Sequence, residues 1–421
     1  MNVSTHASSE EPSVSGDLVI FSQVFPPDPT AVGQYLLDAA REMQRRGFRV
    51  TVYTANRAYE DPGVRFPRHE DMQGIAVRRL PLSSFGKKSL LIRLLGGVSF
   101  TLQCALHGLL RRRTTHLLVS TSPPMCPLAA VIVGVFRRVQ IAYWAMDINP
   151  DQSVAMGAVK PGSLFVRLLD GMNRQILRRA TTVVALDHFM ADRLNRKRDV
   201  RDKLAVIPPW PQEHGLRSVE HAENPFRQRH GLDGKLVVMY SGNLSNASPI
   251  TSVLRAAERL RDLPELVFLF VGGGQAKREI DELIAREAPP NVRSLPYQPF
   301  SELSYSLSAA DVHLVSVGEK IVGICHPCKV YGAMAVARPI VLLGPEESHV
   351  GDLLQRARFG WHIPPDDVDA AERVLREIAA STPQQRAALG QQGRRLVDQE
   401  LSQAALCRRF GDLVEHGPPP R

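Results

Sequence analysis

The chain has 421 residues, of which 44% are hydrophobic and 23% are charged, so a fully disordered or fibrous protein is excluded. Its 52 Lys and Arg exceed its 43 Asp and Glu, and the net charge of +9 favours an anionic partner such as nucleic acid, anionic lipid or a phosphorylated substrate. Five scattered cysteines are too few for a disulfide scaffold and indicate a reducing compartment.

The N-terminal half alternates apolar runs of strand length with helical segments. Residues 1–16 lack the features of a signal peptide and are predicted to form a disordered tail. Residues 17–208 open with a strand at 17–25, a loop, a helix that ends near Gly47 and a second strand. Further strands are expected in HLLVSTS, QIAYWAMDI and TTVVAL. This order predicts an α/β domain with a mostly parallel sheet covered by helices on both faces.

The longest apolar stretch, residues 89–110, is interrupted by polar side chains, so we expect an amphipathic helix rather than a membrane span. Such a helix either packs on the sheet of its own domain or, with flanking cations, docks on an anionic membrane. The predicted apolar face comprises Leu91, Leu94, Leu95, Val98, Leu102, Ala105 and Leu109, the opposite face Ser89, Arg93, Gln103 and His107, and the flanking cations Lys87, Lys88, Arg111, Arg112 and Arg113.

A proline-rich break divides the chain, and residues 209–234 are predicted to be an interdomain linker. Residues 235–395 repeat the alternation of strands and helices, and residues 396–421 are expected to form a C-terminal helix and tail. The predicted fold is therefore α/β, with two Rossmann-like, doubly wound domains that face a ligand cleft between the carboxyl ends of their strands.

Two positions in the first domain could carry chemistry. Gly33 lies between the first strand and the following helix, where an anion could approach exposed N–H groups, although a tight turn explains the glycine equally well. Asp147 ends an apolar strand, which is the usual place for functional groups in an open α/β sheet, and a helix cap is its structural alternative.

Glycines follow two strands of the second domain. Gly242 and Asn243 end one strand and are expected to face the cleft. The glycines of 272–274 follow another strand, but their spacing is not G-x-G-x-x-G, and a turn explains them as well.

The segment CHPCK offers several interpretations. Cys325 and Cys328 have the spacing of a redox pair or half a zinc site, but no second C-x-x-C is present and His326 supplies only one more ligand. Lys329 stands near the start of a predicted helix, where its ammonium group could pair with a diphosphate. A solvated surface lysine is the alternative.

In chain order, these segments resemble glycosyltransferase family 4, the retaining sugar transferases with the GT-B fold, over residues 17 to about 400. The resemblance rests on FPPDPTAVGQYL, YSGNLSN, FLFVGGG, NVRSLPYQPFSEL, LSAADVHLV and HPCKVYGAMAVARP. It is closest to transferases of cell-surface polysaccharide pathways such as colanic-acid and O-antigen synthesis. It implies a hexosyltransferase-type enzyme that uses a nucleotide-diphosphate-sugar donor and an acceptor that is lipid-linked or a glycan. It implies no tightly bound cofactor and no obligatory metal.

The resemblance also implies roles for individual residues. Asp147, near the sugar, and Lys329, facing the diphosphate, are the implied catalytic residues. Donor binding is implied for Gly33, Gly242, Asn243, Gly272, Gly273, Gly274, Tyr297, Gln298 and Lys329, with Tyr297 and Gln298 at the strand end where the base is read.

The chain departs from the family pattern at the expected ribose site. Gly332 stands where the family has the glutamate that holds the ribose, and Ile324 replaces its upstream partner glutamate. Glu319 is the nearest acid that could compensate. The basic residue that often follows the YSGN loop is also missing, unless Lys329 replaces it.

Several alternatives therefore stay open. A GT-B-shaped binding protein without catalysis would explain the two lost glutamates, and a redox or zinc protein would explain the cysteine pair. Nucleic acid is an alternative on charge alone, but no nucleic-acid motif accompanies the dispersed arginines. The expected location is cytoplasmic, with the helix in residues 89–113 near the acceptor entrance and docked on the anionic inner face of the membrane.

Overall fold

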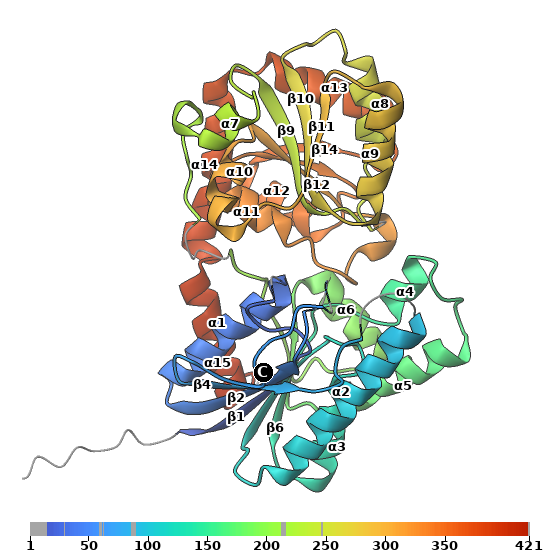
Figure 1. The fold of residues 1–421 in the computed structure, drawn as a ribbon, viewed down its shortest axis with the longest axis vertical. Coiled ribbons are helices and arrows are strands. Elements are labelled where there is room, and N and C mark those ends of the chain that lie inside the picture. Colours follow the sequence, from blue (N-terminus) through green and yellow to red (C-terminus); the bar gives the residue numbers. More distant parts are fainter. Residues whose placement is uncertain are drawn as a thin grey trace, which may run out of the picture.

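The computed structural model describes residues 15–28, 30–58, 61, 63–85, 90–211, 216–245 and 247–419. Two sheets form two α/β domains, one above the other (Figure 1). The predicted fold class is confirmed. Most of the predicted tail, together with Lys87 and Lys88, lies outside the described residues.

The first domain is built on an eight-stranded sheet with the order β3-β4-β2-β1-β5-β6-β7-β8. All neighbours are parallel except β3 and β4, a hairpin that the sequence reading missed. Its strands are β1 (Gly16–Phe21), β2 (Phe48–Ala55), β3 (His69–Met72), β4 (Ile75–Leu80), β5 (His116–Ser120), β6 (Gln140–Trp144), β7 (Thr182–Ala185) and β8 (Leu204–Val206). Its helices are α1 (Ala31–Arg45), α2 (Leu90–Leu110), α3 (Pro127–Phe136), α4 (Asp151–Ala155), α5 (Leu164–Arg179) and α6 (His188–Lys197).

The second domain has a six-stranded, fully parallel sheet with the order β11-β10-β9-β12-β13-β14. Its strands are β9 (Leu236–Asn243), β10 (Leu266–Gly273), β11 (Val292–Leu295), β12 (Val312–Ser316), β13 (Ile340–Leu343) and β14 (Gly360–Ile363). Its helices are α7 (Pro225–Arg229), α8 (Thr251–Arg259), α9 (Gln275–Glu287), α10 (Leu303–Ser308), α11 (Lys329–Ala335), α12 (His349–Ala357), α13 (Val368–Ala380) and α14 (Pro383–Glu400), and the chain ends with α15 (Gln403–His416). Short 3₁₀ turns occupy His221–Glu223, Phe300–Glu302 and Glu319–Ile321.

Helix starts follow local sequence signals. Thr30, Asp187 and Ser402 each precede a helix and accept a hydrogen bond from a backbone N–H of its first turn. Thr382 and Gln385 form a complete capping box at the start of α14. Strands such as β12 are buried along their whole length, as expected for parallel strands covered on both faces.

The last helix, α15, leaves the second domain and packs beside α1 on the first (Figure 1). Phe410 is fully buried, with its ring 4.1 Å from that of Trp144 and 6.3 Å from that of Trp210. Arg46 pairs with Asp412 at 2.8 Å at the edge of this contact. The C-terminal helix therefore completes the core of the N-terminal domain.

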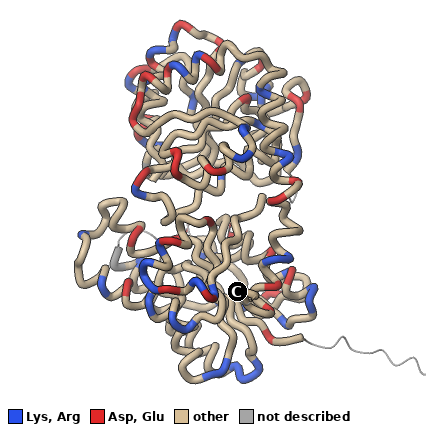
Figure 2. The backbone as a smooth tube through the Cα atoms, turned by 180° about the vertical axis from the view of Figure 1, so that it is seen from behind, with Lys and Arg blue, Asp and Glu red and all other residues tan. Residues whose placement is uncertain are grey.

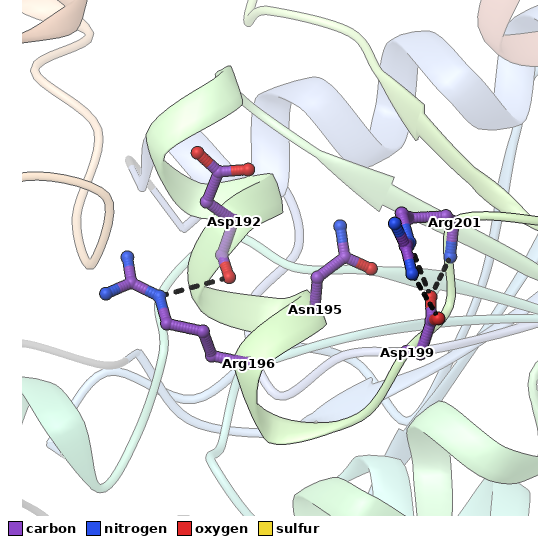
Figure 3. A pocket seen from close by; sticks show the side chains of 5 residues that line it. All are labelled: Asp192, Asn195, Arg196, Asp199 and Arg201. Carbon is purple, nitrogen blue, oxygen red and sulfur yellow. Dashed lines mark hydrogen bonds and ion pairs between the residues drawn. The ribbon is translucent and has the colours of Figure 1, made fainter.

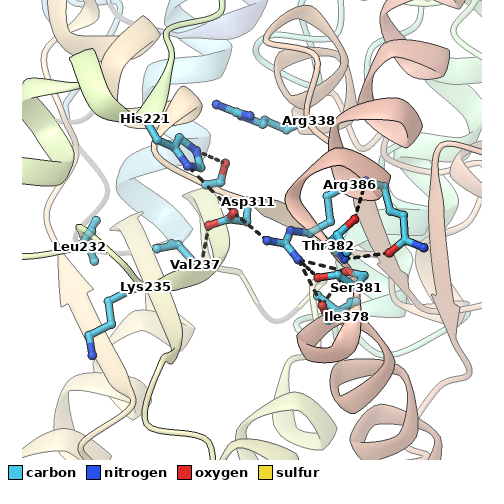
Figure 4. A network of polar contacts seen from close by, with 12 residues as sticks. His221, Leu232, Lys235, Val237, Asp311, Arg338, Ile378, Ser381, Thr382 and Arg386 are labelled. Carbon is cyan, nitrogen blue, oxygen red and sulfur yellow. Dashed lines mark hydrogen bonds and ion pairs between the residues drawn. The ribbon is translucent and has the colours of Figure 1, made fainter.

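A buried polar network holds the helices at the amino edge of the second sheet together (Figure 4). Asp311 accepts a hydrogen bond from the N–H of Val237 at 2.9 Å and lies 3.4 Å from Arg227 and 3.5 Å from Arg386. Arg227 and Arg386 also donate to backbone carbonyl oxygens. Because one carboxylate holds groups from α7, β9 and α14, this network fixes the domain far from the carboxyl ends of its strands.

The predicted apolar face of α2 is wrong. Ala105 is buried, but Leu95 and Leu102 from the same predicted face are exposed. Phe100 and Cys104, which lie outside it, are fully buried. The helix is apolar on nearly its whole circumference, so periodicity alone could not select the face that packs against α3.

The polar side of α2 agrees with the prediction only in part. Arg93 is exposed, whereas His107 is half-buried and its ring stacks on that of Tyr53 at a centroid distance of 4.9 Å. Arg111 makes two hydrogen bonds with the buried Asp17, at 2.9 and 3.0 Å. Since Asp17 begins β1, the arginines lie at the amino edge of the sheet, and only the start of α2 lies near the carboxyl edge.

Candidate active site

The two domains meet at the carboxyl ends of their parallel strands. In the first sheet the strand order reverses between β1 and β5, and in the second between β9 and β12. Ligands of open α/β sheets bind at such points. Of the predicted residues, Gly33 follows β1 and Gly242 lies at the end of β9, so each belongs to one of these reversal points.

Gly33 lies in the first turn of α1, where its N–H donates to the Thr30 hydroxyl at 3.3 Å. A Cβ atom here would lie 3.2 Å from the Cα atom of Phe25. The close approach of α1 to the end of the β1 segment therefore explains the glycine.

Lys329 reaches the end of β9. Its ammonium nitrogen lies 3.8 Å from the ring centroid of Tyr240 and donates a hydrogen bond to the Tyr240 hydroxyl. That hydroxyl donates in turn to the carbonyl oxygen of Asn243 at 2.9 Å. A Cβ atom on Gly242, which has φ +131°, would meet only the Lys329 side chain, at 3.9 Å. The ammonium group of Lys329 therefore lies at the loop after β9, which is where many family members have a basic residue that this chain lacks.

The following glycines pack against their neighbours. A Cβ atom on Gly272 would lie 2.0 Å from the Gly242 carbonyl oxygen, and one on Gly274 would lie 2.3 Å from that of Leu244. A Cβ atom on Gly273 would lie 2.7 Å from the ring of Tyr297. These glycines let the loops after β9 and β10 lie against each other, as the turn interpretation predicts.

Tyr297 and Gln298 follow β11 at the edge of the second sheet. The Tyr297 side chain is 59% exposed beside Gly273. The Gln298 amide donates to the carbonyl oxygen of Pro296 at 2.9 Å. An exposed aromatic ring at a strand end could stack on a nucleotide base.

Asp147 faces the CHPC segment across the domain boundary. Its backbone forms an antiparallel bridge with Cys325, and the next residue, Ile148, donates to the Ile324 carbonyl oxygen at 3.0 Å. Its N–H donates to the Thr121 hydroxyl at 3.1 Å. Asp147 does not cap the next helix, because the N-cap of α4 is Pro150. Burial raises the pKa of the Asp147 carboxyl group, and a hydrogen bond with the Cys325 thiol opposes this.

The two cysteines sit in surroundings that disfavour thiolates. Burial and the charge of Asp147 raise the pKa of Cys328 to about 12. Burial, again with Asp147, raises the pKa of Cys325 still further. A redox or zinc role needs the thiolate form, so these environments argue against that alternative.

A cluster of polar side chains at the domain boundary was not predicted from the sequence. Asp187, His326 and His349 have ligand atoms within 4.8 Å of one another, which is a spacing that a metal ion could use. However, both ring nitrogens of His326 are already engaged, one by Asp187 at 2.8 Å and the other by the hydroxyl of Tyr331 at 2.9 Å. The only sequence signal was a histidine inside the CHPC motif.

The two positions where the family has its ribose-site glutamates carry Ile324 and Gly332 in this chain. A Cβ atom on Gly332 would meet only Leu307, at 3.4 Å, so packing does not require the glycine. Ile324 is buried, and its carbonyl oxygen takes part in the domain contact. Glu319 is exposed beside Gly318, whose N–H donates to the carbonyl oxygen of Ala247 in the loop after β9.

A shallow pocket lies on α6 and the loop after it (Figure 3). Its lining includes none of the predicted site residues, and Asp199 pairs with Arg201 at 2.7 Å. Internally paired charges leave little to attract a ligand, and we assign this pocket no function. The lining residues are Asp192, Asn195, Arg196, Asp199 and Arg201.

Two facing Rossmann-like domains are the architecture of the GT-B class of transferases. The family models agree with this class. Residues 30–210 match the glycosyl transferase 4-like domain, and residues 223–396 match the glycosyl transferases group 1 domain. The chain belongs to this family of glycosyltransferases, which use nucleotide-sugar donors.

Two curated relatives and a solved structure agree with the family. The chain is 25% identical to the probable glycosyltransferase WbjE of Pseudomonas aeruginosa over 72% of its length and 75% of that protein. It is 23% identical to the putative colanic acid biosynthesis glycosyl transferase WcaI of Escherichia coli over 91% of its length and 97% of that protein. The fold is also similar to that of HepE from Anabaena in complex with UDP-glucose, with a TM-score of 0.68, 14% identity and coverage of 94% of this chain and 99% of that one.

Proposed function

We propose that this glycosyltransferase is a retaining enzyme that moves a sugar from a nucleotide-diphosphate donor to a lipid-linked acceptor in cell-surface glycan synthesis. The second domain holds the donor, and the acceptor approaches from the first. The relative named for colanic acid biosynthesis, which covers nearly the whole chain, supports the polysaccharide role.

The observation that carries this proposal is the placement of Lys329 against Tyr240 and beside Gly242. Transfer leaves negative charge on the departing diphosphate, and a lysine at this strand end can neutralise it. Asp147 lies across the boundary, on the acceptor side, where it can orient a sugar hydroxyl or stabilise developing positive charge. Gly242, Asn243 and the start of α1 offer N–H groups to the phosphates.

Lys329→Ala tests the assignment. A charge-assisted hydrogen bond contributes roughly 1.5–3 kcal/mol, so nucleotide-diphosphate affinity should fall about 10- to 100-fold while binding of the bare nucleoside changes little. Calorimetry with UDP, GDP, ADP and dTDP and the matching nucleosides measures both. Lys235→Ala, at the amino end of β9, is the matched control and should bind like wild type. Equal losses for nucleoside and diphosphate would remove Lys329 from the phosphate site.

A second candidate function, nucleotide-sugar binding without turnover, is favoured by Gly332. The open position at Gly332 leaves the ribose without the glutamate that the family uses. Radiolabel transfer from a panel of nucleotide sugars to a membrane lipid extract separates the two functions. Tight binding with no transferred label would favour the binding protein.

A further inference from the structure

Four side chains form an unbroken hydrogen-bond chain across the domain boundary. Asp187, at the start of α6 in the first domain, lies 2.8 Å from Nδ1 of His326 in the second. Nε2 of His326 lies 2.9 Å from the Tyr331 hydroxyl, which lies 2.8 Å from Nε2 of His349. The side chains of Asp187 and His326 are 3% and 1% exposed, so water does not compete for the bond between the domains.

The charges of Asp187 and His349 follow from their surroundings. Asp187 is ionised, because His326 and the N–H of Met190 hold its pKa below the usual value in spite of burial. Nδ1–H of His326 therefore donates to Asp187. Burial lowers the pKa of His349 well below its usual value, so its ring is neutral and shares one hydrogen bond with the Tyr331 hydroxyl. The chain is complete without a metal ion.

Backbone contacts of the same segment bring the domains together. Arg193 of α6 donates to the Val322 carbonyl oxygen at 2.7 Å. Gly323 has φ +70°, and a Cβ atom there would lie 2.6 Å from the backbone of Phe189. Together with the bridge between Asp147 and Cys325, these contacts hold residues 322–326 against the first domain.

We propose that His326 is a positioning residue for sugar transfer. Its bond with Asp187 holds the segment that carries Lys329 against the loop of the first domain that carries Asp147. The proposal rests on the proposed function for the roles of those two residues. Groups on separate domains act on one sugar only while the domains are held together, and a misplacement of about 1 Å can cost roughly 100-fold in rate. His326 touches neither the donor phosphates nor the acceptor in this scheme.

Two substitutions of His326 test its two ring nitrogens separately, because each keeps a nitrogen donor at only one of the two ring positions. In His326→Asn the amide nitrogen replaces Nδ1 and can still donate to Asp187, whereas in His326→Gln it replaces Nε2 and cannot. We expect kcat to fall 10- to 100-fold in His326→Gln and in Asp187→Asn, and His326→Asn to retain most of it. The double variant Asp187→Asn with His326→Gln should be no slower than the slower single variant, because both remove the same bond.

Binding and domain closure provide readouts that a general loss of stability would not mimic. Affinity for the tightest-binding of UDP, GDP, ADP and dTDP should stay within twofold of wild type, since Lys329 is intact. Spin-label distances between the domains, measured with that diphosphate bound, should be longer in His326→Gln and Asp187→Asn than in wild type and His326→Asn. His230→Gln, directly after the last residue of α7, is the matched control and should behave as wild type in every assay.

The outcomes distinguish this proposal from the function on which it rests. If wild type transfers no sugar, the proposed function fails, and the spin-label distances still test whether the bond between Asp187 and His326 holds the domains together. Additive losses in the double variant, equal loss in His326→Asn and His326→Gln, or unchanged distances would overturn the positioning role. A stoichiometric divalent metal that is lost in His349→Ala would also overturn it, because the cluster would then be a metal site.

Discussion

At the scale of single residues, Asp147 is a carboxylate in a place that does not favour its charge. Burial raises its pKa, so the ionised form is destabilised by its surroundings. Such groups are retained at active sites at a cost in stability. This environment supports the catalytic role that we propose for Asp147.

Asp147→Asn should separate these two roles. We expect kcat to fall about 100-fold, as for the loss of one electrostatic contact to a transition state, with no decrease in melting temperature. Initial rates with a fixed donor and thermal unfolding measure the two effects. The exposed Asp202→Asn is the matched control, and an unchanged rate in Asp147→Asn would return this residue to a structural role.

His313 gives a prediction for pH. Burial lowers its pKa to about 4, and its Nε2 lies 2.9 Å from the Leu307 carbonyl oxygen. The unfolded chain, with a histidine pKa of about 6.5, binds more protons between pH 4 and 6.5. Stability therefore rises with pH in this window, and His313 alone should make the protein roughly 2 kcal/mol less stable at pH 5 than at pH 7.

Urea unfolding at pH 5 and pH 7 measures this difference, and His313→Gln, whose amide can still donate, should reduce it by about 2 kcal/mol. His230→Gln removes a less buried histidine and should change it much less. An unaltered difference in His313→Gln would mean that other groups govern acid stability.

At the scale of elements, α15 follows the second domain in the sequence but packs its apolar face against the first domain. Phe410 packs against Trp144 and Trp210, which contact each other and are both fully buried. The contact joins the last helix to residues that are far away in the sequence. Losing it should loosen the first domain rather than the second.

Phe410→Ala should destabilise the protein by about 3–5 kcal/mol, since it removes a buried aromatic ring and leaves a cavity. Tryptophan fluorescence should shift to longer wavelength, because water gains access to two of the indoles. Phe300→Ala, where the ring is 58% exposed, is the control and should cost far less. A normal midpoint of unfolding in Phe410→Ala would show that α15 is dispensable.

At the scale of the whole molecule, one side of the first domain is apolar and ends in cations. Leu110 at the end of α2 is 68% exposed, and Phe136 at the end of α3 is 74% exposed. Arg137 donates to the Leu109 and Arg111 carbonyl oxygens, which brings the ends of both helices together. Lys and Arg gather at this end of the domain, away from the second domain (Figure 2).

We propose that this surface docks on an anionic leaflet, which suits a lipid-linked acceptor. None of the helices in the described ranges is long and apolar enough to cross a bilayer. Arg111 is excluded from the docking cations because it pairs with Asp17. The surface comprises Leu95, Leu102, Leu106, Leu110, Val135 and Phe136 with the exposed Arg112, Arg113 and Arg138.

Flotation with vesicles of phosphatidylglycerol and phosphatidylethanolamine tests docking. Each arginine near the surface contributes about 1 kcal/mol, so neutralising Arg112, Arg113 and Arg138 should weaken binding roughly 100-fold. Salt should weaken wild-type binding, and phosphatidylcholine vesicles should not bind. The triple change of Arg255, Arg278 and Arg395 to Gln, on the second domain, is the matched control. Failure to float with any vesicle would leave the apolar surface without this role.

The sequence by itself determined the α/β architecture, because apolar runs of strand length alternate with helical segments in both halves. It also indicated the strand ends that carry Gly33, Asp147 and Gly242, since functional groups of open sheets gather there. The hairpin of β3 and β4 was missed, because its polar outer strand has no apolar pattern.

Only the tertiary structure decided which groups meet. Periodicity could not select the buried face of α2, because that helix is apolar all round. Lys329 reaches β9, and His326 reaches Asp187, through contacts between segments that are distant in the chain. Local sequence patterns indicate which way a side chain points along its own helix or strand. How two domains pair depends on the packing of both sheets, which is determined by residues throughout the chain.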